Sequence, residues 1–317
     1  MKEEKRLVIV VPCYNEEAVL DETTKRLNEV MSGLIADGLI ADHSIILYVN
    51  DGSCDATWQI IEKLCSDCKY VCGINLASNV GHQNALMAGL ETSKEIGDLA
   101  ISIDADLQDD TAVIRNMVEE FHNGNDIVYG VRKERKVDSF FKRYTAHLFY
   151  TLMAKLGASS IYNHADYRLM SKRSLVQLCN FPERNLFLRG LVPLLGYNTK
   201  KVYYDRHERF AGKSKYPFSK MFNFAVEGIT SFSVKPLRMI TFLGIIFLFI
   251  ALITSAYILV SYLSGNVVDG WTSLISSLWF IGSLILISLG VVGEYIGKIY
   301  IEVKARPRYN IERTILK

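Results

Sequence analysis

The sequence predicts an α/β protein: a mostly parallel sheet flanked by helices, followed by an interfacial amphipathic helix region and two transmembrane helices. Three observations support this fold class. Short apolar runs alternate with longer amphipathic segments between Leu7 and Val131, an order typical of a parallel sheet with helices on both faces. Clusters of polar residues follow several of the apolar runs. Two long stretches without charged residues follow Arg238.

The first part of the chain contains five expected strands and several expected helices. Apolar runs bounded by turn residues predict buried strands over residues 7–11, 45–49, 71–76, 99–103 and 127–131. Apolar residues at helical spacing predict helices over residues 17–34 and 55–64, the second with Asp55 placed to cap it. The stretch "SNVGHQNALMAGL" predicts a turn that leads into a further helix.

Three polar clusters follow the first, second and fourth expected strands: "PCYNEE", "NDGS" and "DADLQDD". Ligands of parallel sheets bind beyond the carboxyl ends of the strands, so we expect these clusters to meet at one ligand-binding edge. No G-x-G-x-x-G follows the first strand and the chain has no P-loop, which argues against a dinucleotide site. Asp109 stands where an EF-hand loop requires glycine.

Composition narrows the class of protein. A formal net charge of +2 is too small to predict a nucleic-acid partner. The apolar run near the N-terminus is too short for a signal peptide, so we expect the first part of the chain in the cytoplasm, where its six cysteines stay reduced. Cys65, Cys68 and Cys72 have metal-like spacing but no fourth ligand nearby, which favours plain thiols over a zinc site.

The last part of the chain predicts membrane helices over about residues 239–263 and 271–293. A helix of about 37 Å for the first run is enough to cross a hydrocarbon core of about 30 Å. A buried helical hairpin in a soluble protein is the alternative. Lys and Arg residues flank both runs but are absent from the loop between them, which predicts that both termini are cytoplasmic. Small residues in the second run would allow helix contacts in a homo-oligomer or within one hairpin: Gly282, Ser283, Gly290 and Gly293.

Four segments are therefore expected. Residues 1–212 form the cytoplasmic domain, residues 213–236 an amphipathic region, residues 237–297 the two transmembrane helices, and residues 298–317 a basic cytoplasmic tail. Apolar residues recur at helical spacing in the second segment: Phe218, Phe222, Ala225, Ile229 and Phe232. Such a helix lies in the membrane interface, or it packs against the soluble domain or another subunit.

The acidic cluster after the fourth strand predicts a metal site. Asp104 and Asp106, with one residue between them, can bracket a divalent cation, and Gln108 can add a neutral oxygen. Hard oxygen ligands of this kind suit Mg²⁺ or Mn²⁺, which in turn bind a diphosphate. The cation would offset the repulsion among the carboxylates and neutralise charge on a leaving diphosphate.

Several motifs carry a family resemblance over nearly the whole chain: "VVPCYNEE", "VNDGSCDAT", "SNVGHQNALMAGL", "DADLQDD", "ADYRLMSK", "RFAGKSKYPFSKM" and "GEYIGKIYIEVKARPRY". In this order they resemble those of membrane-bound polyprenyl-phosphate glycosyltransferases, which are family 2 enzymes of GT-A fold. The similarity is greatest to bactoprenol (undecaprenyl-phosphate) glucosyltransferases. The early motifs are common to many family 2 enzymes, whereas the last is more specific.

The resemblance implies roles for individual residues. It implies that the nucleoside of the donor is held by Pro12, Tyr14, Glu16 and Asp51, and the metal and diphosphate by Asp104, Asp106 and Gln108. Asp166 matches the proposed catalytic base, with Arg168 beside it and Asp106 as a further catalytic residue, although Asp166 could equally position the acceptor or a sugar hydroxyl. Arg209, Ser214 and Lys215 belong to a segment that closes over the phosphates. Arg132 and Arg135 are candidates for the acceptor phosphate, or simply part of a solvated charged face. His82 and His164 are expected to form hydrogen bonds rather than bind metal.

The expected reaction is therefore an inverting transfer of a hexose from a nucleotide-sugar donor to undecaprenyl or another polyprenyl phosphate. UDP-glucose is the first choice of donor by resemblance, with UDP-N-acetylglucosamine, GDP-mannose and an aminoarabinose donor as alternatives. A processive polysaccharide synthase would normally carry a Q-x-x-R-W motif, which none of the tryptophans at positions 58, 271 and 279 completes. A nucleotide-sugar binding protein or a lipid-sugar transporter is the non-enzymatic alternative, but the two apolar runs contain no charge that would mark a transport path.

Overall fold

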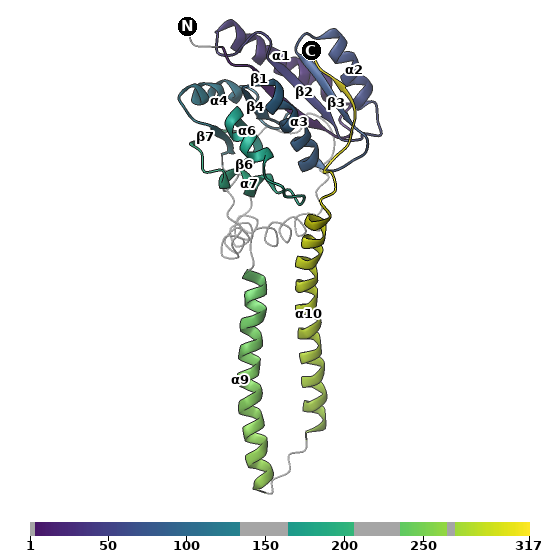
Figure 1. Ribbon diagram of the computed structural model, residues 1–317, viewed down its shortest axis with the longest axis vertical. Coiled ribbons are helices and arrows are strands. Elements are labelled where there is room, and N and C mark those ends of the chain that lie inside the picture. The colour runs from purple at the N-terminus through teal and green to yellow at the C-terminus, as the bar shows by residue number, and fades with distance from the viewer. Residues whose placement is uncertain (1–3, 134–163, 206–234, 265–269) are drawn as a thin grey trace. The chain divides into compact units, whose positions relative to one another are not determined.

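The computed structural model describes residues 4–133, 164–205, 235–264 and 270–317 of the chain (Figure 1). Contacts divide the chain into two compact units. The described part of the first contains a sheet with its helices, together with Arg306–Lys317 at the C-terminus. The described part of the second contains two long helices, α9 (Lys235–Leu263) and α10 (Trp271–Lys304).

The first unit alternates strands and helices along most of its length. Its elements are β1 (Leu7–Cys13), α1 (Leu20–Ala36), β2 (Ile45–Asn50), α2 (Thr57–Asp67), β3 (Val71–Leu76), α3 (His82–Ile96), β4 (Leu99–Ser102), α4 (Val113–His122), β5 (Ile127–Arg132), β6 (His164–Ser171), α6 (Lys172–Cys179), α7 (Leu188–Leu194), β7 (Thr199–Tyr204) and β8 (Ile311–Ile315).

The strands form one eight-stranded sheet in the order β7-β5-β6-β4-β1-β2-β3-β8. Neighbours in the series β4-β1-β2-β3 are parallel, as are β5 and β7. Strand β6 is antiparallel to both β4 and β5, and β8 is antiparallel to β3. The predicted α/β class, with a mostly parallel sheet flanked by helices, is thus confirmed.

Some predicted boundaries differ from the structure. The first helix begins at Leu20 rather than at residue 17, and β4 ends at Ser102 rather than at residue 103. Asp55 was expected to cap α2, but the N-cap position belongs to Ala56, which makes no side-chain capping bond. The Asp55 Oδ1 atom instead accepts a hydrogen bond from the Thr57 amide over 3.0 Å, so Asp55 stabilises the helix start from one position further out.

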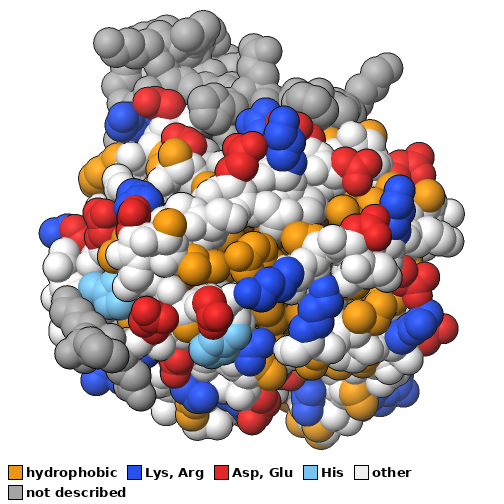
Figure 2. All heavy atoms as spheres, turned by 90° about the horizontal axis from the view of Figure 1, so that it is seen from above, with side chains coloured by type: hydrophobic (Ala, Val, Ile, Leu, Met, Phe, Trp, Pro, Cys, Tyr) orange, Lys and Arg blue, Asp and Glu red, His pale blue; other side chains and the backbone are white. Residues whose placement is uncertain are grey.

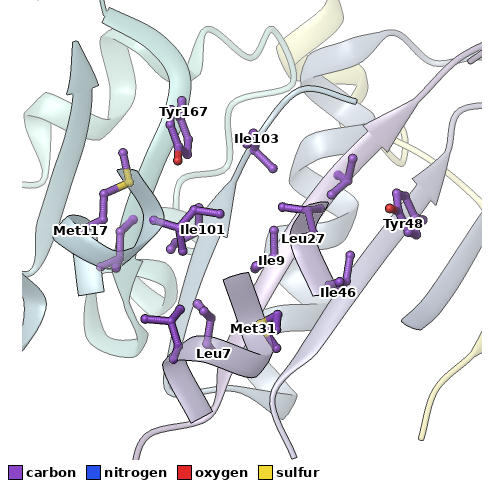
Figure 3. Close-up of a cluster of buried hydrophobic side chains, with 14 of the residues drawn as sticks. Leu7, Ile9, Leu27, Met31, Ile46, Tyr48, Ile101, Ile103, Met117 and Tyr167 are labelled. Carbon is purple, nitrogen blue, oxygen red and sulfur yellow. The ribbon is translucent and has the colours of Figure 1, made fainter. Parts of the chain in front are cut away.

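One face of the sheet carries the main hydrophobic core (Figure 3). Leu27 and Met31 of α1 lie over Ile9, Ile46 and Ile101, which come from three neighbouring strands and are fully buried. Burial of a side chain of this size contributes about 1.5–3 kcal/mol to folding. The core therefore holds β1, β2 and β4 in a fixed arrangement, and with them the turns at their carboxyl ends.

Helix α3 packs on the other face of the same strands. A Cβ atom on Gly89 would lie 2.3 Å from Val10 Cγ1 and 3.0 Å from Val49 Cγ2, so only glycine allows the helix to approach this closely. Because α3 follows β3 directly in the chain, its N-terminus starts at the carboxyl edge of the sheet. Close packing against β1 and β2 fixes that N-terminus beside the polar turns.

One face of the first unit is mixed in charge. On the face shown in Figure 2, Lys and Arg side chains are interspersed with Asp and Glu side chains. No single sign of charge dominates that face. Mixed charge of this kind is typical of a protein surface that lies in water.

The second unit consists, in its described part, of two apolar helices. Phe247 and Phe280 bring them into contact, with 6.0 Å between their ring centroids. By length and composition both helices are able to cross a membrane, with mean hydropathy of 2.4 over Leu237–Thr254 and 1.8 over Phe280–Lys304. Helix α10 continues beyond the predicted end at residue 293. Of the predicted amphipathic region, residues 213–234 lie outside the described residues.

The predicted basic tail, residues 298–317, contains regular secondary structure. It continues α10 as far as Lys304, and Ile311–Ile315 then forms β8 at the edge of the sheet. The register pairs Gly73 of β3 with Ile315 and Ile74 with Thr314. The C-terminal residues are therefore part of the first unit.

Candidate active site

The carboxyl ends of β1, β2 and β4 meet at one edge of the sheet, and each is followed by a predicted polar cluster. The register pairs Cys13 with Asn50, and the Asp51 amide donates to the Cys13 carbonyl over 2.9 Å. On the other side of β1, the Ile103 amide donates to the Val10 carbonyl over 3.1 Å. The structure therefore brings the three clusters together as expected.

Side chains from the second cluster and from the first residue of α2 hold the turn after β1. The Asn15 residue has a positive φ of 54°, and its amide donates to Ser53 Oγ over 3.0 Å. The Glu16 amide donates to Thr57 Oγ1 over 2.9 Å. The residues predicted to bind the nucleoside all lie in these two adjoining turns or at the end of β1: Pro12, Tyr14, Glu16 and Asp51. Tyr14 exposes 41% of its surface, so its ring is accessible to a ligand.

Asp51 anchors the loop that leads into α3. Its Oδ1 atom accepts from the Val80 amide over 2.7 Å, and its Oδ2 atom accepts from the Gly81 amide over 3.0 Å. Burial raises the pKa of Asp51, and the two backbone hydrogen bonds oppose that rise. Gly52 beside it has a φ of +60°, and an added Cβ would lie 2.4 Å from the Asn79 amide nitrogen. Asp51 thus orients the start of α3.

The turn after β4 carries the predicted metal ligands. The Asp106 Oδ1 atom accepts from the Gln108 amide over 3.1 Å, and Leu107 between them has a positive φ of 58°. The Asp104 side chain remains 38% exposed. Desolvation raises the pKa of Asp104, and neighbouring carboxylates, including Asp109, add to the rise. A cation at this turn would relieve that repulsion.

The donor set fits a divalent cation that shares its coordination with a substrate. Among the residues that the structure describes, no group of three or more His, Cys, Asp and Glu side chains is arranged to hold a metal. Mg²⁺ at phosphate-binding sites usually takes only one or two carboxylates and completes its shell with phosphate oxygens and water. Asp104 and Asp106 provide two such carboxylates, which suits a cation bound together with a diphosphate.

Cationic and amide groups from three elements surround the Asp166 carboxylate on β6. Arg168 Nη2 donates to its Oδ1 atom, and Arg189 Nη2 of α7 donates to its Oδ2 atom over 3.0 Å. From the start of α3, His82 Nε2 lies 3.6 Å from Oδ2, and Gln83 Nε2 donates to Oδ2 over 3.5 Å. Asp166 is only 6% exposed, so these groups take most of the space around its carboxylate.

Electrostatics keep Asp166 ionised. Burial alone would raise its pKa, but Arg189, His82 and Arg168 outweigh burial and hold the pKa well below its ordinary value. For His82 the effects have the opposite signs: burial lowers its pKa, but Asp166 and Asp104 outweigh burial and raise the pKa to about 9. A general base works best with a pKa near the operating pH. A strongly lowered pKa makes Asp166 a weak base, so the alternative that it positions the acceptor or a sugar hydroxyl stays open beside the predicted role as catalytic base.

Arg168 supports this arrangement from within the protein. It is 2% exposed, and its Nη1 atom donates to the Leu188 carbonyl over 3.2 Å, while Nη2 binds Asp166. A side chain buried to this extent orients its neighbours and has little surface to offer a substrate. Arg168 therefore contacts Asp166 and the Leu188 carbonyl, and its predicted catalytic role stays a prediction.

A second ion-pair cluster lies at the end of β5. Arg132 Nη2 donates to Asp109 Oδ1 over 3.0 Å, and Tyr204 Oη donates to the same oxygen over 2.6 Å. Burial lowers the pKa of Arg132, but Asp109 outweighs this effect and raises it. The Arg132 side chain remains 26% exposed. It is a fixed and partly accessible cation, which suits its predicted role toward an acceptor phosphate.

The structure does not describe every predicted site residue, and it adds residues to the site that were not predicted. Arg135, Arg209, Ser214 and Lys215 lie outside the described residues and stay predictions. Four further residues contact Asp166 or Arg132: Gln83, Arg189, Asp109 and Tyr204. Gln83 and Asp109 lie in motifs singled out above but had no predicted role, whereas Arg189 and Tyr204 lie in none of those motifs, because only the fold brings them to the site. His82 Nε2 lies 3.6 Å from Asp166 and 3.8 Å from Asp104, and His164 pairs with Val131 in the register of β5 and β6; their expected hydrogen-bonding roles stay predictions.

Two family comparisons cover most of the chain. Residues 8–179 match the family described as glycosyl transferase family 2, and residues 235–299 match the GtrB C-terminal hairpin. The sequence is 55% identical over 306 residues to the Bacillus subtilis protein named uncharacterized glycosyltransferase YkoT, covering 96% of this chain and 91% of that protein. It is 40% identical over 312 residues to the SfII prophage-derived bactoprenol glucosyl transferase of Shigella flexneri, covering 98% of both chains.

Similar folds occur among solved structures at low sequence identity. Mannosyl-3-phosphoglycerate synthase from Rubrobacter xylanophilus has a TM-score of 0.47 and 16% identity, covering 70% of this chain and 71% of that chain. Glucosyl-3-phosphoglycerate synthase from Mycobacterium tuberculosis, in a complex with Mn²⁺, UDP and glucosyl-3-phosphoglycerate, has a TM-score of 0.44 and 17% identity, covering 71% of this chain and 78% of that chain.

Proposed function

Because the chain belongs to glycosyl transferase family 2 and is therefore a glycosyltransferase, we propose that it transfers a hexose from a nucleotide sugar to a polyprenyl phosphate. The single observation that carries this proposal is the 40% identity, over 98% of both chains, to a bactoprenol glucosyl transferase. The similarity includes the apolar helices as well as the sheet, so it extends to the part of the chain that would meet a lipid acceptor.

The donor would bind at the edge formed by the turns after β1, β2 and β4. Tyr14 is accessible there, and Pro12, Glu16 and Asp51 line the adjoining turns. By resemblance the donor is UDP-glucose. The alternatives are UDP-N-acetylglucosamine, GDP-mannose and an aminoarabinose donor, and the experiment below distinguishes them.

Mg²⁺ or Mn²⁺ would be held by Asp104, Asp106 and Gln108 and would supply neutralisation of the charge that develops on the departing diphosphate. The two carboxylates in the turn after β4 support a cation there, because a divalent cation would offset their repulsion. The chain's own residues bind and orient the substrates. Arg132, anchored by Asp109, would bind the acceptor phosphate.

The proposed reaction is a single displacement with inversion at the anomeric carbon. An oxygen of the acceptor phosphate forms a bond to that carbon while the bond to the nucleoside diphosphate breaks, and the electron pair leaves with the diphosphate. A lipid phosphate is already ionised near neutral pH, so no general base has to remove a proton from it. Asp166 would instead hold His82 and Arg189 in place at the edge of the site.

The apolar helices α9 and α10 would span the cytoplasmic membrane as a hairpin, with the sheet and both termini in the cytoplasm. The support for this orientation is the distribution of Lys and Arg, which flank the two helices but are absent from the loop between them. The lipid acceptor would then reach the site from the cytoplasmic leaflet.

The experiment is transfer of radiolabel to undecaprenyl phosphate by the purified full-length protein in detergent, using each of the four donors with Mg²⁺ or Mn²⁺. We expect one donor to give a labelled lipid, and we expect EDTA to abolish the product and added metal to restore it. A folded protein that labels no lipid with any donor would overturn the proposed acceptor. Label that is insensitive to EDTA would overturn the proposed metal dependence alone.

A further inference from the structure

The chain segment between α10 and β8 makes a compact set of contacts with the first unit. Arg308 and Tyr309 both bind the side chain of Glu91 in α3: Arg308 Nη1 donates to Oε1 over 2.9 Å, and Tyr309 Oη donates to Oε2. Arg308 exposes only 7% of its side chain. These residues belong to the "RPRY" end of the most specific motif in the sequence, and the proposed reaction gives them no role.

The Arg308 guanidinium also binds a second segment. Its Nη2 atom donates to the Phe181 carbonyl over 2.5 Å, and its Nε atom donates to the Glu183 carbonyl over 3.1 Å. The planar guanidinium presents donors in a fixed geometry. One side chain therefore connects α3 to the loop between α6 and α7, and replacing it by a residue with fewer donors would release at least one of the two.

Both segments lead to the Asp166 carboxylate. Helix α3 begins with His82 and Gln83, and the loop continues into α7 with Arg189. Gln83 joins them directly, because its Oε1 atom accepts from the Leu188 amide over 3.1 Å while its Nε2 atom donates to Asp166 over 3.5 Å. The two segments are thus tied at one end by Gln83, beside the site, and at the other end by Arg308.

We propose that Arg308 is a positioning residue for the transfer reaction: by holding α3 and the loop before α7 together, it sets the spacing of His82 and Arg189 around Asp166. The inference rests on the proposed function, since it concerns the same site. A misplacement of about 1 Å, caused by a change far from the reacting atoms, can reduce a rate by about 100-fold. The contacts of Arg308 with α3 and with the loop before α7 would therefore influence turnover, although Arg308 lies outside the site.

The test compares Arg308→Gln with Arg313→Gln in the full-length protein. Arg313 serves as the control because it also lies in the C-terminal segment and also pairs with a helix, through Glu62 of α2, but in the described part of the chain it does not pair with a residue around Asp166. We expect Arg308→Gln to lower kcat about tenfold while the KM for the donor changes less than about twofold. Arg313→Gln should leave both close to the values of the unchanged protein. Equal kcat values for the two variants would overturn the inference.

Hydrogen–deuterium exchange provides a readout that does not depend on activity. In Arg308→Gln, the backbone amides of residues 184–189 should exchange faster, including the Leu188 amide that Gln83 binds, while Arg313→Gln leaves them unchanged. If Arg308→Gln fails to fold, Glu91→Gln is used instead, because it removes the charge and keeps the shape of the side chain. Unchanged exchange in Arg308→Gln, or in Glu91→Gln where it replaces Arg308→Gln, would contradict the inference. If the unchanged protein labels no lipid at all, the proposed function is wrong. The exchange experiment then still shows whether Arg308 holds α3 and the loop before α7 together.

Discussion

Arg189 of α7 forms an ion pair with Asp166 of β6, with 3.0 Å between Nη2 and Oδ2. The two residues come from different elements, and His82 Nε2 of α3 lies 3.6 Å from the same oxygen. A carboxylate surrounded in this way keeps its charge and holds its neighbours still. We therefore expect substitutions of Asp166 to disturb the positions of Arg189 and His82.

We expect Asp166→Asn to reduce turnover by about 100-fold while the Kd for the donor changes less than twofold. Asparagine keeps one acceptor oxygen but no longer balances the charges of Arg168, Arg189 and His82. Transfer of label gives turnover and calorimetry gives donor binding. Asp126→Asn is the matched control, since Asp126 is also buried and also pairs with an arginine, Arg173. Loss of donor binding together with activity would show that Asp166 binds the donor instead.

Substitution of Arg132 should affect the acceptor rather than the donor. We expect Arg132→Gln to raise the KM for polyprenyl phosphate about tenfold, because the neutral side chain loses a charge-assisted hydrogen bond worth about 1.5–3 kcal/mol. Initial rates at varied lipid and fixed saturating donor measure this. The neighbouring Lys133, whose exposed side chain pairs with Asp205 over 3.2 Å, provides the control Lys133→Gln. Equal lipid KM values for the two variants would remove Arg132 from the acceptor site.

Two glycine substitutions should have opposite effects on stability. In Gly89→Ala the new methyl group would meet Val10 and Val49 of the sheet, and overpacking of this kind costs about 1–3 kcal/mol. In Gly33→Ala the nearest atom is 3.7 Å away, at Arg115, so the higher helix propensity of alanine should stabilise α1 by about 0.5–1 kcal/mol. Urea denaturation in detergent measures the free energy of unfolding, and a stabilising effect of Gly89→Ala would contradict the packing of α3 described here.

The stability contributed by Asp126 should depend on pH. Hydrogen bonds from Arg173 and Ser171 outweigh burial and lower the pKa of Asp126 in the folded state. A carboxyl group with a lowered folded-state pKa stabilises the protein above its unfolded pKa of about 3.9, and this contribution disappears as the pH falls through the folded-state value. The difference in thermal midpoint between the unchanged protein and Asp126→Asn should therefore narrow below about pH 4. A difference that stays constant or widens on acidification would show that the ion pair is not the cause.

The sequence predicts the parallel core of the sheet well, because buried parallel strands consist of continuous apolar runs such as Leu7 to Val11 and Val71 to Leu76. It does not predict β6, because Asp166 and Arg168 interrupt the apolar pattern of this strand. The two side chains can be buried since they form an ion pair with each other. Nor does the sequence predict β8, since a short polar strand at a sheet edge has no distinct pattern and its partner β3 lies far away in the chain.

The candidate site divides in the same way. The sequence predicts that Asp51, Asp104 and Asp106 lie at the carboxyl edge of the sheet, because each belongs to a polar cluster that follows an apolar strand; the role of Asp51 toward the donor rests on the resemblance. Arg168 was expected beside Asp166, but Arg189 could not be assigned, since it reaches Asp166 only because β6 lies between β4 and β5 in the sheet. The role of Arg308 depends likewise on where the C-terminal segment returns to the first unit.

The most direct test of the central claim is mass spectrometry of the lipid extracted after incubating the full-length protein with undecaprenyl phosphate, UDP-glucose and Mn²⁺, with Asp106→Asn in parallel. We expect the unchanged protein to convert the lipid to a species heavier by one hexose unit, and folded Asp106→Asn to leave it unconverted. A lipid that keeps its mass with every nucleotide sugar would contradict the proposed transfer, and equal conversion by Asp106→Asn would show that the reaction does not depend on the turn after β4.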